Sequence, residues 1–281
     1  MALGTANIPE LLNDQVASLL VQPLEAASVV LSSGVRVFDT AGVLRIPKLT
    51  GSSAVGYYSE HEEIASTHST TFDEVVLMPT DRASIKTIER YSRESVRQSV
   101  IGLDAVLKAR LTKVVADKLD TELLKGTGAD DGITGILNQP GVETGVFDPT
   151  DPDTILDAIA TLNANEVEPN RIFMSGAAFS QMRKIKQDSG SARYLLEPDP
   201  TRESSQRLFN VPLVVTNKLG QFDVIVADTT NIAVARDVNP SITVLTERYA
   251  EFDEIGLRIT CRYDLGLLHP EAVCVLSEPG S

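Results

Sequence analysis

The sequence predicts a mixed α+β fold in which some elements project from the body of the chain. Three observations predict it: apolar residues at helical spacing over 92–125, a polar excursion between strand-like segments over 49–81, and alternating helix and strand patterns over 151–239. The chain has 281 residues, 42% of them hydrophobic, enough to bury a sizeable core. A helix and an excursion of these lengths exceed what such a body can cover, so we expect them to contact partners.

The N-terminal segment, residues 1–34, is expected to be an arm. Residues 8–21 have the pattern of an amphipathic helix with Pro9 at its first position, and a second short apolar helix is expected to reach Ser32. Neither a basic secretory start nor an apolar run of transmembrane length occurs, so we expect no signal peptide and no membrane span.

Residues 35–48 predict two strands joined by a turn at Thr40, Ala41 and Gly42. The excursion that follows, 49–81, is expected to be a long two-stranded hairpin with a polar tip near 59–70. A hairpin of this kind is marginally stable by itself. Residues 82–92 predict a further strand.

The strongest pattern is the helix predicted over 92–125. Its apolar residues fall three to five positions apart: Val96, Val100, Leu103, Leu107, Leu111, Val114 and Leu119. Ser92 is the expected N-cap, Lys125 lies in the last turn and Gly126 follows as the residue that ends the helix. Such a helix would be roughly 50 Å long.

The stretch "LLKGTGADDGITGILNQPGV" (123–142) is rich in glycine, which raises the question of a phosphate-binding loop. Phosphate loops precede a helix, where backbone amides and the dipole attract an anion. This one follows a helix and contains Asp130 and Asp131. We therefore expect structural glycines, which allow a helix stop and a tight loop. They are Gly126, Gly128, Gly132 and Gly135.

The second half of the chain alternates between helix and strand patterns. Helices are expected at 151–165 and 176–190, and strands at 171–175, 211–217 and 223–237. The final stretch, 241–277, is rich in strands, and its alternation predicts long antiparallel strands that return to the long helix.

Residues with catalytic or metal-binding chemistry are few. A metal site of His61, Glu63 and His68 is conceivable at the hairpin tip, although a flexible tip holds ligands poorly. Asp148, Asp151 and Asp153 could offer oxygens to calcium, but helix capping is the preferred interpretation. His269 is interpreted as structural, and "RKIK" (183–186) as an exposed helix face. We expect no catalytic, cofactor-binding or metal residues, no cofactor and no enzymatic activity.

The two cysteines and the net charge further limit the functions that the chain could have. Cys261 and Cys274 are expected to be small buried residues, with a disulfide possible if their strands pair. The net charge is −14, so the surface as a whole repels nucleic acid and anionic membranes.

Six segments in order resemble the major capsid proteins of tailed bacteriophages of the Hong Kong 97 type. They are "VRVFDTAGVLRIPKLTGSSAVGYYSEHEEI" with "TFDEVVLMP", "IERYSRESVRQSV", "LLKGTGADDGITGILN", "RIFMSGAAFSQMRKIKQDSG", "LFNVPLVVTN" and "RITCRYDLGLLHPEAVCVL". One departure is Asn210, which stands where the family usually has glycine.

The resemblance implies the Hong Kong 97-type capsid fold, with an N-terminal arm, an extended E-loop hairpin, a peripheral domain with a long spine helix, and an axial domain. The implied ranges are 1–34 for the arm, 35–48 for peripheral strands, 49–81 for the E-loop, 82–150 for the peripheral domain with spine helix 92–125, 151–239 for the axial domain and 240–281 for closing peripheral strands.

The implied function is self-assembly into an icosahedral shell around double-stranded DNA, built from hexamers and pentamers in the host cytoplasm. The implied partners are further copies of the chain, a portal and a separate scaffolding protein. DNA is expected to be enclosed without tight binding. Two alternatives remain: an encapsulin-type compartment shell, and a soluble enzyme or ligand-binding protein that uses the 151–239 unit.

Two departures limit what carries over from the family. Some members join an E-loop lysine to a neighbour's asparagine, but no lysine lies between Lys48 and Lys86 and no asparagine within 251–262. We expect no such cross-link, so particles boiled in detergent should give monomers. Many members also begin with a cleaved scaffolding segment, whereas Met1 here directly precedes the arm.

The excursion 50–81 contains six acidic residues and no lysine or arginine. We expect tip carboxylates to pair with arginines of a neighbouring subunit; the alternative is a solvated tip that touches no charge. The predicted inter-subunit contacts are Glu60, Glu62, Glu63, Arg82, Arg90, Arg93 and Arg97.

Overall fold

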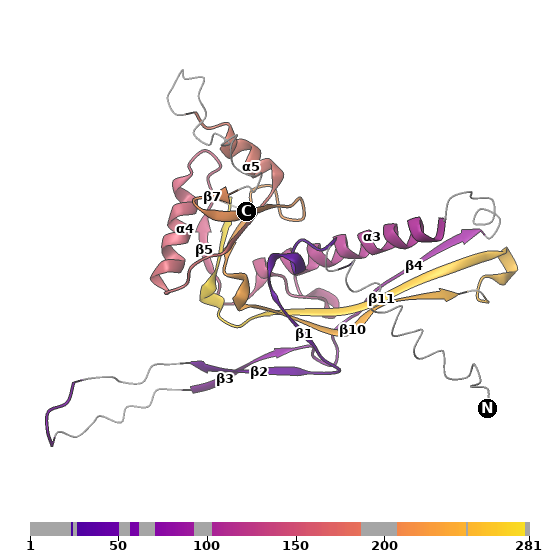
Figure 1. Ribbon diagram of the computed structural model, residues 1–281, viewed down its shortest axis with the longest axis horizontal. Coiled ribbons are helices and arrows are strands. Elements are labelled where there is room, and N and C mark those ends of the chain that lie inside the picture. Colours follow the sequence, from indigo (N-terminus) through magenta and orange to yellow (C-terminus); the bar gives the residue numbers. More distant parts are fainter. Residues whose placement is uncertain are drawn as a thin grey trace, which may run out of the picture.

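Figure 1 shows the computed structural model, which has two β-sheets, a long helix and a projecting two-stranded ribbon. The structure describes residues 24, 27–50, 57–61, 71–92, 103–186, 207–245 and 247–278. The amphipathic helix expected at 8–21 lies outside these residues. The mixed α+β architecture agrees with the fold class that the sequence predicts.

The first sheet has four strands in the order β1-β10-β11-β4. They are β1 (Arg36–Asp39), β10 (Ile232–Leu245), β11 (Glu254–Leu267) and β4 (Ile85–Ser92). β1 runs parallel to β10, and the other pairs are antiparallel. Helix α3 (Leu103–Lys125) covers one face, with Leu111, Leu119 and Leu123 in one core with side chains of β11. The long antiparallel strands that return to the helix are therefore confirmed.

The helix ends at Lys125, as predicted. Ser92, the expected N-cap, is the last residue of β4 and pairs with Glu254, and residues 93–102, where the helix is expected to start, lie outside the described residues. The described part of the helix has 23 residues, or roughly 34 Å. Val114, counted in the apolar periodicity, is 46% exposed, and Val115 packs into the core instead.

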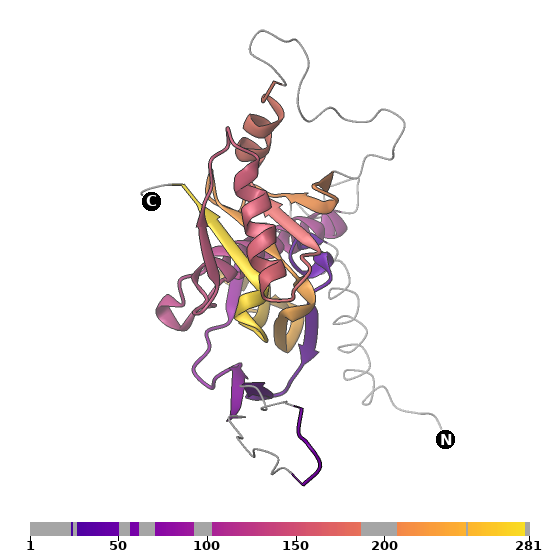
Figure 2. The ribbon, with the colours of Figure 1, turned by 90° about the vertical axis from the view of Figure 1, so that its left-hand side faces the viewer.

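The second sheet has six strands in the order β5-β12-β9-β6-β8-β7. They are β5 (Glu143–Val146), β12 (Val273–Ser277), β9 (Val224–Ala227), β6 (Arg171–Met174), β8 (Val211–Val215) and β7 (Arg207–Leu208). Helices α4 (Asp153–Ala164) and α5 (Gly176–Arg183) share a core with one face, and the other face joins the core of α3 (Figure 2). Burial on both faces explains why every residue of β9 is apolar.

Sheet membership does not follow the ranges implied by the resemblance. β5 and β12 lie outside 151–239 yet belong to the six-stranded sheet, and β10 begins inside that range yet belongs to the four-stranded sheet. The chain passes between the sheets at the turns before β10 and before β12. The division into axial and peripheral domains stays a prediction.

Helix α5 is shorter than the sequence predicts. It ends at Arg183, with Lys184 as the C-cap, instead of continuing to Gly190. Backbone N–H groups of Lys184 and Ile185 bond the carbonyls of Gln181 and Met182, which closes the last turn. Ile185 then packs against the second core, so "RKIK" does not form a single helix face.

Both cysteines are buried and free, so no disulfide joins them. They lie in different cores, Cys261 beneath α3 and Cys274 beneath α4 and α5. Burial raises the pKa of the Cys261 thiol to about 12 and that of Cys274 to about 11. Within the described residues, no helix is both long and apolar enough to cross a membrane.

The glycine-rich loop after α3 folds tightly back onto the end of the helix. Thr127 and Thr134 form a β-bridge, and the Asn138 amide donates to the carbonyls of Lys125 and Gly126. A Cβ on Gly126 would lie 2.2 Å from the Ile133 carbonyl oxygen. Three further glycines shape the loop: Gly128 has φ 72°, a Cβ on Gly132 would lie 2.8 Å from the Ala129 oxygen, and one on Gly135 would lie 2.5 Å from the Gly126 nitrogen.

We predict that Gly126→Ala lowers the free energy of unfolding by about 1–3 kcal/mol, because the added methyl overlaps backbone atoms that cannot move independently. Urea unfolding of the subunit, followed by circular dichroism, measures the change. Gly42→Ala is the matched control, since a Cβ there meets nothing within 4 Å. Equal effects of the two substitutions would contradict the prediction.

Candidate subunit-contact surfaces

Strands β2 (Leu44–Thr50) and β3 (Thr71–Leu77) form a two-stranded sheet that, with its tip residues 57–61, we call the ribbon. It runs from Leu44 opposite Leu77 to Thr50 opposite Thr71, and Figure 1 shows it extending away from both sheets. Two strands with no covering layer are marginally stable in water. The ribbon therefore depends on its root in the body and on whatever its far end contacts.

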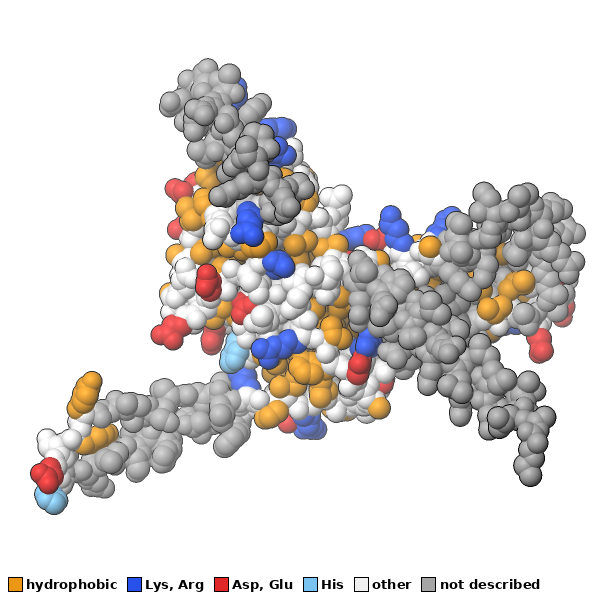
Figure 3. Space-filling view, in the orientation of Figure 1, with side chains coloured by type: hydrophobic (Ala, Val, Ile, Leu, Met, Phe, Trp, Pro, Cys, Tyr) orange, Lys and Arg blue, Asp and Glu red, His pale blue; other side chains and the backbone are white. Residues whose placement is uncertain are grey.

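The tip of the ribbon presents acidic and aromatic side chains to solvent (Figure 3). Tyr57 is fully exposed, and Glu60 and His61 are exposed beside it. A fully exposed tyrosine leaves its ring in water, although such rings contribute most when buried at interfaces.

The root of the ribbon, at Leu77 and Met78, packs in an apolar cluster on the four-stranded sheet. Leu77 and Met78 are buried against Ala233 and Ala235 of β10. Gly266 of β11 completes the cluster, because a Cβ there would lie 2.6 Å from a methyl of Leu77.

The face of the four-stranded sheet away from α3 is rich in positive charge. Ile85 and Tyr91 of β4 pack toward the helix core, so the alternate residues Lys86, Ile88 and Arg90 point the other way. Arg258 lies opposite Ile88 in the ladder and is exposed. In a chain of net charge −14, this face combines three cations and an exposed isoleucine with one acid, Glu254, which lies beside Arg90.

The arginines predicted to receive the tip carboxylates differ in availability. Arg82 forms an ion pair with Asp264 at 3.0 Å, and its side chain is 15% exposed. Arg90 is 57% exposed; its guanidinium lies 3.9 Å from Glu254 and 5.1 Å from the centre of the Tyr249 ring. The tip and the end of β4 lie at opposite ends of the molecule, so one chain cannot bring Glu60 to Arg90 (Figure 1).

Four of the predicted contact residues, Glu62, Glu63, Arg93 and Arg97, lie outside the described residues. The same holds for Glu63 and His68 of the conceivable metal site, while His61 is exposed. Among the residues that the structure describes, no three His, Cys, Asp or Glu side chains form a group that could hold a metal ion.

The aspartates considered for calcium organise turns. Asp148 accepts hydrogen bonds from the backbone N–H and hydroxyl of Thr150, and these bonds lower the pKa of its carboxyl. Asp151 accepts from the N–H of Asp153 at the start of α4. Asp151 therefore closes a turn that leads into α4, whose N-cap Pro152 has no side-chain cap, so the helix-capping interpretation is not confirmed.

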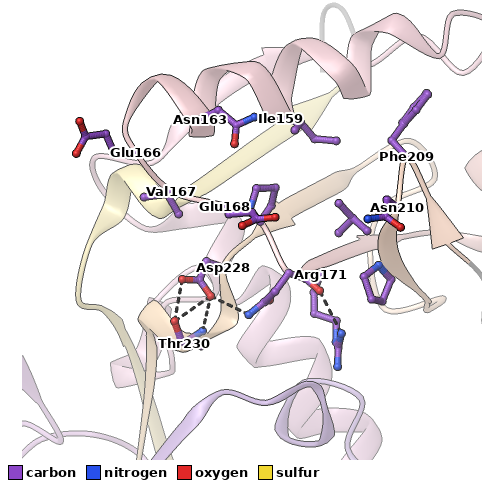
Figure 4. Close-up of a pocket in the computed structure, with 14 residues that line it drawn as sticks. Ile159, Asn163, Glu166, Val167, Glu168, Arg171, Phe209, Asn210, Asp228 and Thr230 are labelled. Atoms are coloured by element: carbon purple, nitrogen blue, oxygen red, sulfur yellow. Dashed lines mark hydrogen bonds between the residues drawn. The ribbon is translucent and has the colours of Figure 1, made fainter.

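A shallow hollow of about 820 Å³ lies between the end of α4, the β7–β8 turn and the turn before β10 (Figure 4). One of its charged groups is Asp228, whose carboxylate accepts from the Asn170 amide, the Thr230 hydroxyl and the Asn231 amide. These bonds occupy the carboxylate within the chain. No serine, cysteine or histidine lines the hollow, so it offers no nucleophile paired with a histidine base.

The segment before β1 is attached to α3 by one buried aspartate. Asp120 accepts hydrogen bonds from the Ser28 hydroxyl at 2.5 Å and from the N–H groups of Val29 and Val30 at 2.9 and 3.2 Å. Sequence reasoning missed this residue, although an aspartate on a buried stretch of helix is itself a signal.

Comparisons with known proteins agree with this architecture. Residues 10–277 match the family model described as phage capsid family. The comparison with curated proteins finds no match.

Similar solved structures include the capsid of a native GTA particle, with a TM-score of 0.73, 15% identity, and 88% of this chain and 89% of that chain covered. A chain of Microbacterium phage Oxtober96 aligns with a TM-score of 0.71 and 15% identity over 89% of this chain and 91% of its own. A chain of Mycobacterium phage Bobi aligns with a TM-score of 0.71 and 16% identity over 90% of this chain and 91% of its own. At these identities the likeness establishes a shared fold.

We predict that Asp120→Asn lowers the free energy of unfolding by about 1–3 kcal/mol, because an amide cannot accept from all three donors without loss and leaves a buried group unpaired. Asp117→Asn on the same helix is the control. It removes only the partly exposed ion pair with Lys218, worth about 0–1 kcal/mol. Urea unfolding monitors both, and an Asp120→Asn loss no larger than the control's would refute the prediction.

Proposed function

The chain belongs to the phage capsid family, and we propose that its copies close into an icosahedral shell around the double-stranded DNA of a tailed bacteriophage. It is a structural major capsid protein, with the Hong Kong 97-type fold that the sequence motifs suggest. A virion shell of many copies is the setting in which this protein acts.

One observation supports shell assembly most directly: the ribbon leaves the body, and of its described tip residues Tyr57, Glu60 and His61 are exposed. Its exposed tyrosine and its seven-residue strands are stabilised only if another molecule receives them. A second copy of the chain supplies that surface in a shell, and each copy both gives and receives a ribbon. Many modest interfaces then add up to a stable particle.

The proposal extends to the partners that the resemblance implies. Hexamers and pentamers of the chain assemble in the host cytoplasm, with a portal and a separate scaffolding protein. The net charge of −14 agrees with a shell that encloses DNA without binding it tightly, because an acidic surface repels phosphates.

We place the tip of the ribbon on a neighbour's four-stranded sheet. Arg82 binds Asp264 in its own chain, so the receiving charges are Arg90, Arg93 and Arg97 rather than all four arginines. Lys86 and Arg258 share the exposed face with Arg90 and extend it. Each exposed pair contributes about 0.2–1 kcal/mol, and the shell repeats it at every subunit.

The assembly experiment is size-exclusion chromatography of the purified chain or of particles, followed by electron microscopy. Elution in the void volume with round, closed shells is the expected result. A small soluble oligomer would refute shell assembly and favour the enzyme alternative. Nuclease-protected DNA inside the particles separates a viral shell from one that packages enzymes.

We predict that the double substitution Glu62→Lys with Glu63→Lys lowers the yield of closed particles several-fold, because it replaces attraction to a basic surface with repulsion. Adding Arg93→Glu or Arg97→Glu should partly restore the yield. Glu62→Asp with Glu63→Asp keeps both charges and is the control. Normal yield from the lysine variant would mean that the tip touches no charged surface.

A further inference from the structure

The segment that returns the ribbon to the body, residues 78–82, is held by one guanidinium of β11. Arg262 donates from Nε to the Arg82 carbonyl at 3.0 Å, and from Nη2 to the carbonyls of Pro79 at 3.0 Å and Thr80 at 3.3 Å. Its Nη1 pairs with Asp237 of β10 at 2.7 Å. One side chain thus fixes three carbonyls between β3 and β4.

Asp264, two residues further along β11, binds the first residue of the same segment, Met78. Its carboxylate accepts from the backbone N–H of Met78 at 2.8 Å and forms the ion pair with Arg82. Arg82 also donates to the carbonyls of Asp131 and Gly132 in the loop after α3. The return segment is therefore bound to the sheet and to the end of the long helix.

The outgoing side of the ribbon has a matching attachment. Asp39, at the end of β1, pairs with Nε and Nη2 of Arg236 on β10 at 2.7 and 2.6 Å. The N–H of Thr40 donates to the carbonyl of Arg236 at 2.9 Å. Arginine–aspartate pairs on neighbouring strands thus flank both sides of the root.

These polar contacts fix the direction of the ribbon, which the apolar contacts of Leu77 cannot do. Hydrophobic contact is non-directional, whereas the planar guanidinium fork fixes the angle of the groups it binds. Seven paired residues extend about 23 Å, so a rotation of about 10° at the root would move the far end by roughly 4 Å. A shift of that size exceeds the tolerance of a hydrogen bond or ion pair on a neighbour.

We propose that Arg262, with Asp237, Asp264 and Arg82, is a positioning clamp that fixes the direction of the ribbon and so sets the angle between neighbouring subunits. The second part rests on the proposed shell function. The first part concerns a single chain and can be tested without a shell. Arg262 and Asp264 make no contact with the tip, so they act through the direction of the ribbon.

The first experiment measures that direction by pulsed electron spin resonance on the full-length chain in solution. Nitroxide labels are placed at Asp73→Cys on β3 and Val114→Cys on α3, both exposed. The native thiols are buried with raised pKa values and should stay unlabelled. We expect one narrow distance distribution, widened at least twofold by Arg262→Gln, and less by Arg262→Lys.

Arg183→Gln, which removes an exposed arginine on α5, is the control and should leave the distribution unchanged. If Arg262→Gln does not fold by circular dichroism, Asp237→Asn takes its place, because it removes only the carboxylate that orients Arg262. An unchanged width in the folded Arg262 or Asp237 variant would overturn the clamp.

The second experiment measures particle diameters by electron microscopy. Shells of Arg262→Gln should vary in diameter or fail to close, while Arg183→Gln shells match the unsubstituted protein. Uniform shells of normal diameter from Arg262→Gln would overturn the role in setting the subunit angle. If the unsubstituted chain itself forms no shell, the proposed function fails, and the distance measurement still decides the clamp.

Discussion

The pairing of β11 with β10 on one side and β4 on the other is the interaction on which the rest of the structure depends. From Glu254 to Leu267, one face of β11 supplies Leu257, Ile259 and Cys261 to the core under α3. Its last six residues include Arg262, Asp264 and Gly266, which contact the root of the ribbon. One strand therefore joins the helix, the sheet and the projecting element into a single mechanical unit.

Charge is used differently in the body and at its surface. The buried Asp120 and Asp264 each satisfy several donors, as a charge in a dry environment requires. At the surface, exposed Glu60 lies at the ribbon tip, and exposed Lys86, Arg90 and Arg258 lie on the uncovered face of the four-stranded sheet. The tip and the end of β4 lie at opposite ends of one chain, so an attraction between them would act between molecules (Figure 1).

Local pattern predicted much of the fold and little of its internal polar network. The end of α3 at Lys125, strands β6 and β8 and the burial of both cysteines follow from periodicity and composition. The single strand expected at 223–237 is wrong, because the turn at Thr229–Asn231 divides it into β9 and β10, which belong to different sheets. At Ser92 the local pattern predicts a helix cap and gives no sign of the ladder that this residue forms with Glu254 of a distant strand. Arg262 and Asp264 carried one readable sign, charges inside an apolar strand, but their partners in the segment 78–82 lie about 180 positions away. The acidic excursion 50–81 indicates a contact between copies, but one sequence does not show which residues of a neighbour would receive it.

The four-stranded sheet also has a kinetic consequence. β1 pairs with β10 at Arg36 and Ala233, and β4 pairs with β11 at Ile85 and Cys261, so neither pair can form until distant parts of the chain meet. Folds dominated by such pairings form slowly, because loop closure precedes any compensating contact. We therefore expect folding, rather than collision between subunits, to limit the supply of competent subunits, which would keep their free concentration low while particles grow.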